Sequence, residues 1–166
     1  LSSYPFISVL KGDKSLSSRP MNRIIDPLIK MNGEFKSTNG SLPLKIIGKE
    51  LNNFNHEILI PSAQVKSAIL LAGLHAPGAT SVIELRPTRD HTERMLKYFG
   101  ADITVEEIAA GNKITIIGQP ELIPTEVTVP GDPSSAAFPV VAALLIKGSK
   151  IKLPGICKNP NRIGVY

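Results

Sequence analysis

A short segment in the middle of the sequence combines polar side chains with the start of an apolar helix, an arrangement that can bind an anion. In PSAQVKSAILLAGL, Ser62, Gln64 and Lys66 lie where a β-rich run ends and a helix-forming run begins. The first turn of a helix has backbone N–H groups without intrahelical acceptors, at the positive end of the helix dipole. The segment is a candidate anion site, although a Ser62 cap followed by exposed polar residues is also an ordinary helix start.

A second segment, RPTRDHTER at residues 86–94, brings three arginines into nine residues. Arginine binds phosphate and carboxylate groups through paired N–H donors, so this density suits an anion clamp. We expect Arg89 to contact a ligand and Arg94 to be structural. The alternative is a solvated charged turn in which Asp90 or Thr92 caps the next helix and Glu93 lies in its first turn.

Two further segments are weaker candidates. Arg19 precedes Pro20, which keeps it extended before the next helix, where it could bind an anion or be an ordinary surface arginine. In VPGDPSSAAF, Asp132, Ser134 and Ser135 are predicted to cap a helix that has Pro133 at its first position.

Other chemistries find little support. The single cysteine, Cys157, excludes an intrachain disulfide, and three scattered histidines give no metal-ligand spacing, so we predict no metal site. GNK at 111–113 lacks the spacing of a phosphate-binding loop, so no Walker-type site is expected. His91 lies among helix-capping residues, and Cys157 has no neighbouring histidine. Neither is assigned a catalytic role.

The elements that must position these residues recur along the chain. Stretches that begin at Gly12, Gly78 and Gly148 each read as a strand followed by a turn with an arginine, and the first two lead into amphipathic helices. In the second helix, Met95, Leu96 and Phe99 are predicted to share a face. Between these stretches, residues 57–74 and 126–145 each read as a β-rich run, a proline and an apolar helix. The repeating unit is therefore strand, helix, strand, helix, strands, which places the chain in the α/β (α+β) class.

Composition limits the partners. The chain has 166 residues, 42% hydrophobic and 20% charged, with a net charge of +5 that favours anions. Lys and Arg are spread out, without the aromatic stripe that stacks bases, so we expect small phosphorylated ligands and no nucleic acid. No apolar run reaches the roughly 18 residues that a membrane span needs. We expect a soluble cytoplasmic protein, and both ends look like cuts within a longer sequence.

Five motifs together resemble one enzyme family. RPMNRIIDPL, LIPSAQVKSAILLAGL, TRDHTERML, VPGDPSSAAF and NPNRIG occur in the order and at about the spacing found in bacterial 3-phosphoshikimate 1-carboxyvinyltransferases, the EPSP synthases. The resemblance implies transfer of the enolpyruvyl group of phosphoenolpyruvate to the 5-hydroxyl of shikimate 3-phosphate, without a cofactor. It also implies two lobes, each of three βαβαββ units with helices inside and sheets outside.

The resemblance assigns roles to matching residues. Arg19 matches a phosphoenolpyruvate-binding arginine that also contacts glyphosate. Ser62, Ala63 and Gln64 match the segment that binds shikimate 3-phosphate, with Ala63 where many members have a second serine, and Thr88 and Arg89 match the turn that closes on its phosphate. Arg162, in NPNR where NPTR is usual, is interpreted as structural.

The same resemblance predicts an incomplete enzyme. Residues 1–130 would form about two repeat units of the first lobe, and residues 131–166 the crossover and the start of a truncated second lobe. The N-terminal Lys-Ser motif and the later acidic and basic residues of the family lie outside this sequence, so the chain is expected to be inactive alone. Its apolar helix after Pro133 would leave a surface prone to self-association. The alternatives are a non-catalytic remnant of a split or decayed gene and, more distantly, a UDP-N-acetylglucosamine enolpyruvyl transferase, whose reactive loop cysteine is a distinguishing mark.

Overall fold

The computed structural model describes residues 1–164 and 166, which form two compact units, Leu1–Ile123 and Pro124–Tyr166. We describe each unit by itself. No helix in the described part of the chain combines the length and apolar character that crossing a bilayer requires.

The larger sheet of the first unit has four strands in the order β4-β5-β7-β6. Its strands are β4 (Asn55–Ile58), β5 (Ala79–Glu84), β6 (Ile103–Ile108) and β7 (Gly111–Ile117). β4 and β5 are parallel and are connected through α3 (Ala63–Gly73), whereas β7 pairs antiparallel with both β5 and β6. With α4 (His91–Tyr98) between β5 and β6, these elements make one complete βαβαββ unit.

A three-stranded antiparallel sheet precedes it, in the order β1-β3-β2. It contains β1 (Ile7–Leu10), β2 (Glu34–Thr38) and β3 (Ser41–Ile47), with the helices α1 (Lys14–Ser17) and α2 (Asn22–Lys30) between β1 and β2. This order matches that of β5-β7-β6, so the N-terminal sheet and α2 repeat the second half of the complete unit.

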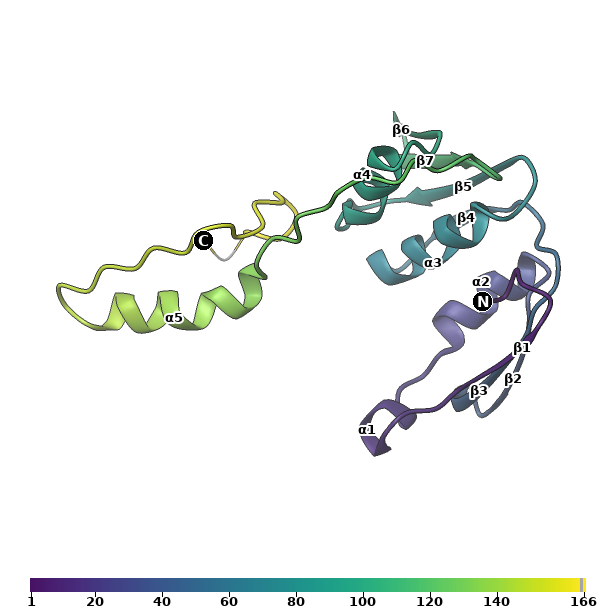
Figure 1. The fold of residues 1–166 in the computed structure, drawn as a ribbon, viewed down its shortest axis with the longest axis horizontal. Coiled ribbons are helices and arrows are strands. Elements are labelled where there is room, and N and C mark those ends of the chain that lie inside the picture. The colour runs from purple at the N-terminus through teal and green to yellow at the C-terminus, as the bar shows by residue number, and fades with distance from the viewer. Residues whose placement is uncertain (165) are drawn as a thin grey trace. The chain divides into compact units, whose positions relative to one another are not determined.

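Helices α2 and α3 pack against each other, and Figure 1 shows them between the two sheets of the first unit. The burial follows sequence periodicity: Ile114 and Ile116 point inward from alternate positions of β7, and Ile69 and Leu70 do so from one side of α3. Most buried apolar residues form one core cluster, which includes Met31 and Val82, whereas Ile25, Leu44 and Ile46 form a second cluster on the N-terminal sheet. The predicted fold class, repeated α/β units with helices inside and sheets outside, is confirmed.

Several predicted local structures are wrong. The stretch after Gly12 is the short helix α1, capped by Asp13, and the strand lies before it. The runs 126–130 and 148–153 form no strand, because neither pairs with another strand among the described residues, and a strand requires a hydrogen-bonded neighbour. On α4, Leu96 is buried but Met95 is 47% exposed, and the buried position beside Leu96 belongs to Glu93.

The second unit consists of helix α5 (Pro133–Leu145) with coil on either side of it. The coil after the helix contacts the N-terminal end of α5 through Arg162. The predicted cap is confirmed, because Asp132 accepts hydrogen bonds from the backbone N–H groups of Ser134 and Ser135. These bonds and the Ser135 hydroxyl, assisted by Arg162, lower the pKa of the Asp132 carboxyl. Arg162 donates to Asp132 at 2.7 Å and to the Ser134 hydroxyl at 2.8 Å, which agrees with its predicted structural role.

The close approach of β7 to the end of α3 requires glycine at position 118. Gly118 donates its N–H to the Gly78 carbonyl, and a Cβ at this position would overlap the Ala76 carbonyl oxygen and lie 2.6 Å from that of Gly73. We expect Gly118→Ala to lower the free energy of unfolding by about 1–3 kcal/mol, the usual cost of overpacking, in urea denaturation. Gly164→Ala, where nothing lies within 4 Å of the added Cβ, is the control, and an equal loss in both variants would contradict the account.

Candidate functional site

The N-terminus of α3 supplies the first part of the site. Ser62 has an extended backbone, and its Oγ accepts the N–H of Val65 at 3.4 Å, so the predicted cap is confirmed. In the first turn Gln64 is exposed and Ala63 is half-buried, whereas Val65 begins the buried side. The start of a helix favours an anion, because its first N–H groups lack intrahelical acceptors and it is the positive end of the helix dipole.

The turn between β5 and α4 supplies the second part. Arg86 and Arg89 are exposed on it, while Thr88 is partly buried and bound to the end of β5. Glu84 Oε2 accepts the Thr88 N–H at 3.1 Å and the Thr88 hydroxyl at 2.8 Å. Two hydrogen bonds to one carboxylate oxygen therefore fix the residue next to Arg89.

A buried ion cluster connects the two parts. The Lys66 ammonium lies 3.1 Å from Glu84 Oε2, 3.2 Å from Glu84 Oε1 and 2.6 Å from Glu93 Oε1, and its side chain is 0% exposed. Lys66 comes from α3, Glu84 from β5 and Glu93 from α4. We call these three residues the ion cluster. Because charged groups are held inside proteins only when paired, the cluster fixes the positions of three elements relative to one another.

A hydroxyl pair makes a second connection between the helices. The hydroxyls of Ser67 on α3 and Thr92 on α4 lie 2.6 Å apart. Beside this pair is a hollow of about 380 Å³. Its lining consists of Ala63, Gln64, Ser67, Ala68, Leu71, Arg89, His91 and Thr92. We call it the anion hollow, because a helix N-terminus and an arginine meet there.

The structure brings together three of the six predicted site residues. Ala63, Gln64 and Arg89 line the anion hollow. Thr88 adjoins Arg89 but is directed to Glu84. Ser62 caps α3, and the hollow that it lines is a neighbouring one. Arg19 is exposed in the segment between α1 and α2 and lines none of the three hollows described in this section.

The position of Lys66 differs from the one inferred from the sequence. We expected an exposed cation beside an anion, but the ammonium is fully buried between carboxylates and is not available to a ligand. Glu93, expected to be a first-turn helix residue, belongs to the same cluster. Asp90 is the cap residue of α4, yet its side chain makes no capping bond and instead binds Arg94 at 2.7 Å.

A sequence signal for this cluster existed. Lys66 shares its side of α3 with Ile69, Leu70 and Gly73, at the helical spacing of three, four and seven residues. Glu84 has the same alternating register on β5 as the buried Val82. A charged residue on each apolar face requires a buried partner, and the two together point to a pair. His91 and Ser67 also line the anion hollow and were not predicted to do so.

The neighbouring hollow, of about 650 Å³, is lined by residues of both signs, including Arg23, Asp26, His56 and Glu57. Burial, and then the nearby Lys30 ammonium, lower the pKa of His56 below its ordinary value, so its imidazole is neutral at pH 7. Unlike the anion hollow, this hollow therefore has no excess of positive charge in its lining.

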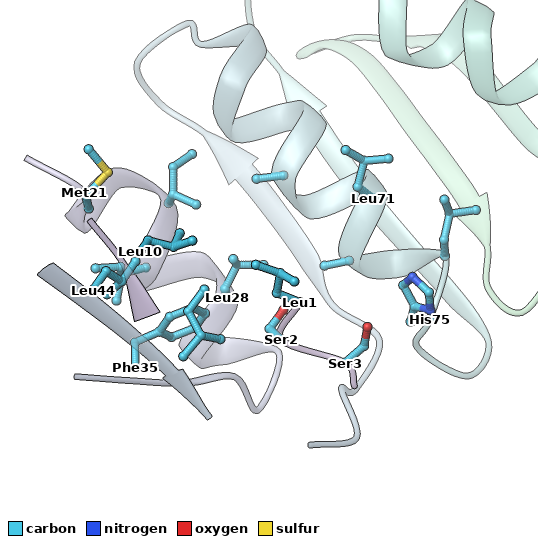
Figure 2. A pocket seen from close by; sticks show the side chains of 16 residues that line it. Leu1, Ser2, Ser3, Leu10, Met21, Leu28, Phe35, Leu44, Leu71 and His75 are labelled. Atoms are coloured by element: carbon cyan, nitrogen blue, oxygen red, sulfur yellow. The ribbon is translucent and has the colours of Figure 1, made fainter. Parts of the chain in front are cut away.

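A third hollow, of about 420 Å³, is apolar. Figure 2 shows Leu28, Phe35 and Leu44 on one side of it, with Leu71 and His75 on the other. Its lining lacks arginine and lysine. It is unsuited to a phosphorylated ligand.

Solved structures define the class of this fold. The structure of EPSP synthase from Acinetobacter baumannii at 2.37 Å matches with a TM-score of 0.83 and 47% sequence identity, over 96% of this chain and 36% of that one. A second structure of the Acinetobacter baumannii enzyme matches equally well. The chain therefore has the fold of an enolpyruvyl transferase.

Sequence comparisons narrow the class. The 3-phosphoshikimate 1-carboxyvinyltransferase of Paramagnetospirillum magneticum is 52% identical over the whole chain, and that of Paracoccus denitrificans is 54% identical over 98% of it. The sequence profile of EPSP synthase (3-phosphoshikimate 1-carboxyvinyltransferase) matches residues 1–166. The chain belongs to the EPSP synthase family. It spans 38% and 37% of the length of these two relatives, and the alternative of a UDP-N-acetylglucosamine enolpyruvyl transferase is less supported.

Removing the Lys66 ammonium from the ion cluster should lower the free energy of unfolding. Lys66→Met keeps the length of the side chain but leaves two buried carboxylates without their cation. We expect a loss of about 3–5 kcal/mol in the free energy of unfolding, measured by urea denaturation. Lys97→Met, on the exposed side of α4, is the matched control and should stay within about 0.5 kcal/mol of the parent chain. Similar losses for both lysines would show that the ion cluster is not a special support.

Proposed function

We propose that this chain provides part of the shikimate 3-phosphate site of a 3-phosphoshikimate 1-carboxyvinyltransferase. The observation that carries the proposal is the anion hollow, where Ala63 and Gln64 at the N-terminus of α3 lie with Arg89. Membership of the EPSP synthase family supports shikimate 3-phosphate as this anion. The complete enzyme transfers the enolpyruvyl group of phosphoenolpyruvate to the 5-hydroxyl of this substrate and releases inorganic phosphate.

Each residue has a role suited to its place. Arg89 binds the phosphate of shikimate 3-phosphate through its fork of N–H donors, while the first turn of α3 supplies backbone donors. Gln64 hydrogen-bonds both substrates, Ser62 and Ala63 contact shikimate 3-phosphate at the start of the helix, and Thr88 shapes the turn. Arg19 is assigned to phosphoenolpyruvate by family resemblance alone, because no hollow described above includes it.

Turnover requires more of the family's length than this chain contains. The chain spans about 37% of its curated relatives, and the acidic and basic residues that the family uses for proton transfer lie outside it. Residues 1–130 are assigned to the first lobe and residues 131–166 to the crossover and the start of the second. We expect binding without catalysis, because groups that act together in a transition state do not contribute separately. A cytoplasmic location suits the biosynthetic role.

Arg89→Ala should abolish most of the binding of shikimate 3-phosphate. A charge-assisted bond to phosphate contributes about 1.5–3 kcal/mol, so the dissociation constant measured by calorimetry should rise about 10- to 100-fold. Arg94→Ala is the matched control, because Arg94 lies in the same segment but is bound to Asp90. An unchanged affinity in Arg89→Ala would overturn the site assignment. The absence of binding by the parent chain would favour a non-catalytic remnant.

The second unit is proposed to self-associate through α5. Phe138, Leu144 and Leu145 are 79%, 80% and 81% exposed, a density of apolar surface typical of contact sites. We expect sedimentation to show a mass that rises with concentration, and the double change Leu144→Gln with Leu145→Gln to suppress it. The pair Leu59→Gln with Ile60→Gln, equally exposed in the first unit, is the control. A monomer at every concentration would refute the proposal.

A further inference from the structure

Stabilising the fold does not by itself require the arrangement seen in the ion cluster. Packed apolar side chains could join α3, β5 and α4 with similar or greater stability, because buried ions lose their hydration. The cluster instead contains two carboxylates for one ammonium, and all three side chains are at most 7% exposed. A directional network of this kind fixes geometry. Lys66 and Glu93 each adjoin in sequence a residue that lines the anion hollow, Ser67 and Thr92, which suggests that the geometry is that of the hollow.

The two carboxylates are not equivalent. Glu84 contacts Lys66 with both oxygens and also accepts two hydrogen bonds from Thr88. Glu93 contacts Lys66 through Oε1, while its buried Oε2 has no hydrogen-bond partner among the described residues. Among the contacts described here, the turn between β5 and α4 is therefore bound to Glu84, whereas Glu93 is bound to Lys66.

This asymmetry connects the cluster to the anion hollow. Lys66 lies two residues after Gln64 on α3, and Thr88 immediately precedes Arg89. If the turn moved away, Glu84 would lose two of the bonds that satisfy a buried carboxylate, which is costly. The turn is consequently held where Arg89 lines the same hollow as Gln64.

We propose that Glu84 and Lys66 are positioning residues for the anion site, acting through the turn of Thr88 and Arg89 without touching the ligand. Lys66 holds Glu84, Glu84 holds Thr88, and Thr88 sets the place of the Arg89 backbone. The inference rests on the proposed function for the identity of the ligand, but the positioning itself is a property of the chain without ligand.

The decisive comparison is Glu84→Gln against Glu93→Gln in the full 166-residue chain. Both remove one charge from the same cluster with almost no change in shape. A carboxamide at position 84 loses one of the two acceptor oxygens. If its oxygen stays on Thr88, its NH₂ faces the Lys66 ammonium, and if its oxygen takes the place of Oε1 on Lys66, its NH₂ faces the Thr88 N–H. A carboxamide at position 93 can keep its oxygen on Lys66 and turn its NH₂ to the side that has no partner.

Two readouts separate positioning from stability. In the chain without ligand, ¹⁵N relaxation should show greater fast motion of the Thr88 amide and the Arg89 side-chain Nε–H in Glu84→Gln, and no change in Glu93→Gln. With shikimate 3-phosphate, calorimetry should show an affinity about tenfold weaker in Glu84→Gln and within about twofold of the parent in Glu93→Gln. Ile46→Val, in the hydrophobic cluster of the first sheet, destabilises the chain away from the turn and should leave both readouts unchanged.

A double-mutant cycle adds a check that a purely structural role would not pass. In the R89K background, the point charge of lysine depends less on the orientation of the turn, so E84Q should weaken binding by less than about threefold. If Glu84→Gln does not fold, Thr88→Val replaces it, since this change removes one donor to Glu84 and keeps every charge. The same loss of order at Arg89 is then expected.

The outcomes are distinct. Equal effects of Glu84→Gln and Glu93→Gln, or an unchanged turn in Glu84→Gln, would overturn the positioning role. If the parent chain binds no shikimate 3-phosphate, the proposed function fails together with the ligand part of this inference, while the relaxation data still decide whether Glu84 orders the turn.

Discussion

One buried ammonium in contact with two carboxylates joins three elements of the first unit, and one of these carboxylates, Glu84, also binds the turn that contributes Arg89 to the anion hollow. Lys66 is the common partner of Glu84 and Glu93, which come from a strand and from a different helix. Because such a contact is favourable only at close distances and defined angles, it restricts how α3, β5 and α4 can lie. Apolar packing brings these elements together, and the ion cluster restricts how they are aligned with one another.

The groups proposed to attract the anion differ from the groups that support the site. The ion cluster has more negative than positive charge when all three residues are ionised, so it does not attract a phosphate. In the proposed site, the groups that attract the anion are the first turn of α3 and Arg89, both of which line the anion hollow. Because Lys66 is buried, Arg89 is the exposed cation of the proposed site, and a guanidinium is able to bind a phosphate with two parallel N–H bonds.

Local signals in the sequence were sufficient for much of this structure. The caps of α3 and α5 at Ser62 and Asp132 were predicted because they depend on residues within three positions. Features that depend on distant partners were not foreseen. The burial of Lys66 requires Glu84 and Glu93, each 18 or more residues away, and the expected strands at 126–130 and 148–153 lack a neighbour with which to pair. Arg19 could be assigned only by resemblance, because it lines none of the three hollows described above.

A crystal structure of the chain with shikimate 3-phosphate would test the central claim most directly. The account expects the phosphate in the anion hollow, bound by Arg89 and by backbone N–H groups at the start of α3, with Lys66 still between Glu84 and Glu93 and out of reach of the ligand. A phosphate bound elsewhere, or a Lys66 ammonium that leaves the carboxylates to contact it, would contradict the division between the groups that bind and the groups that position.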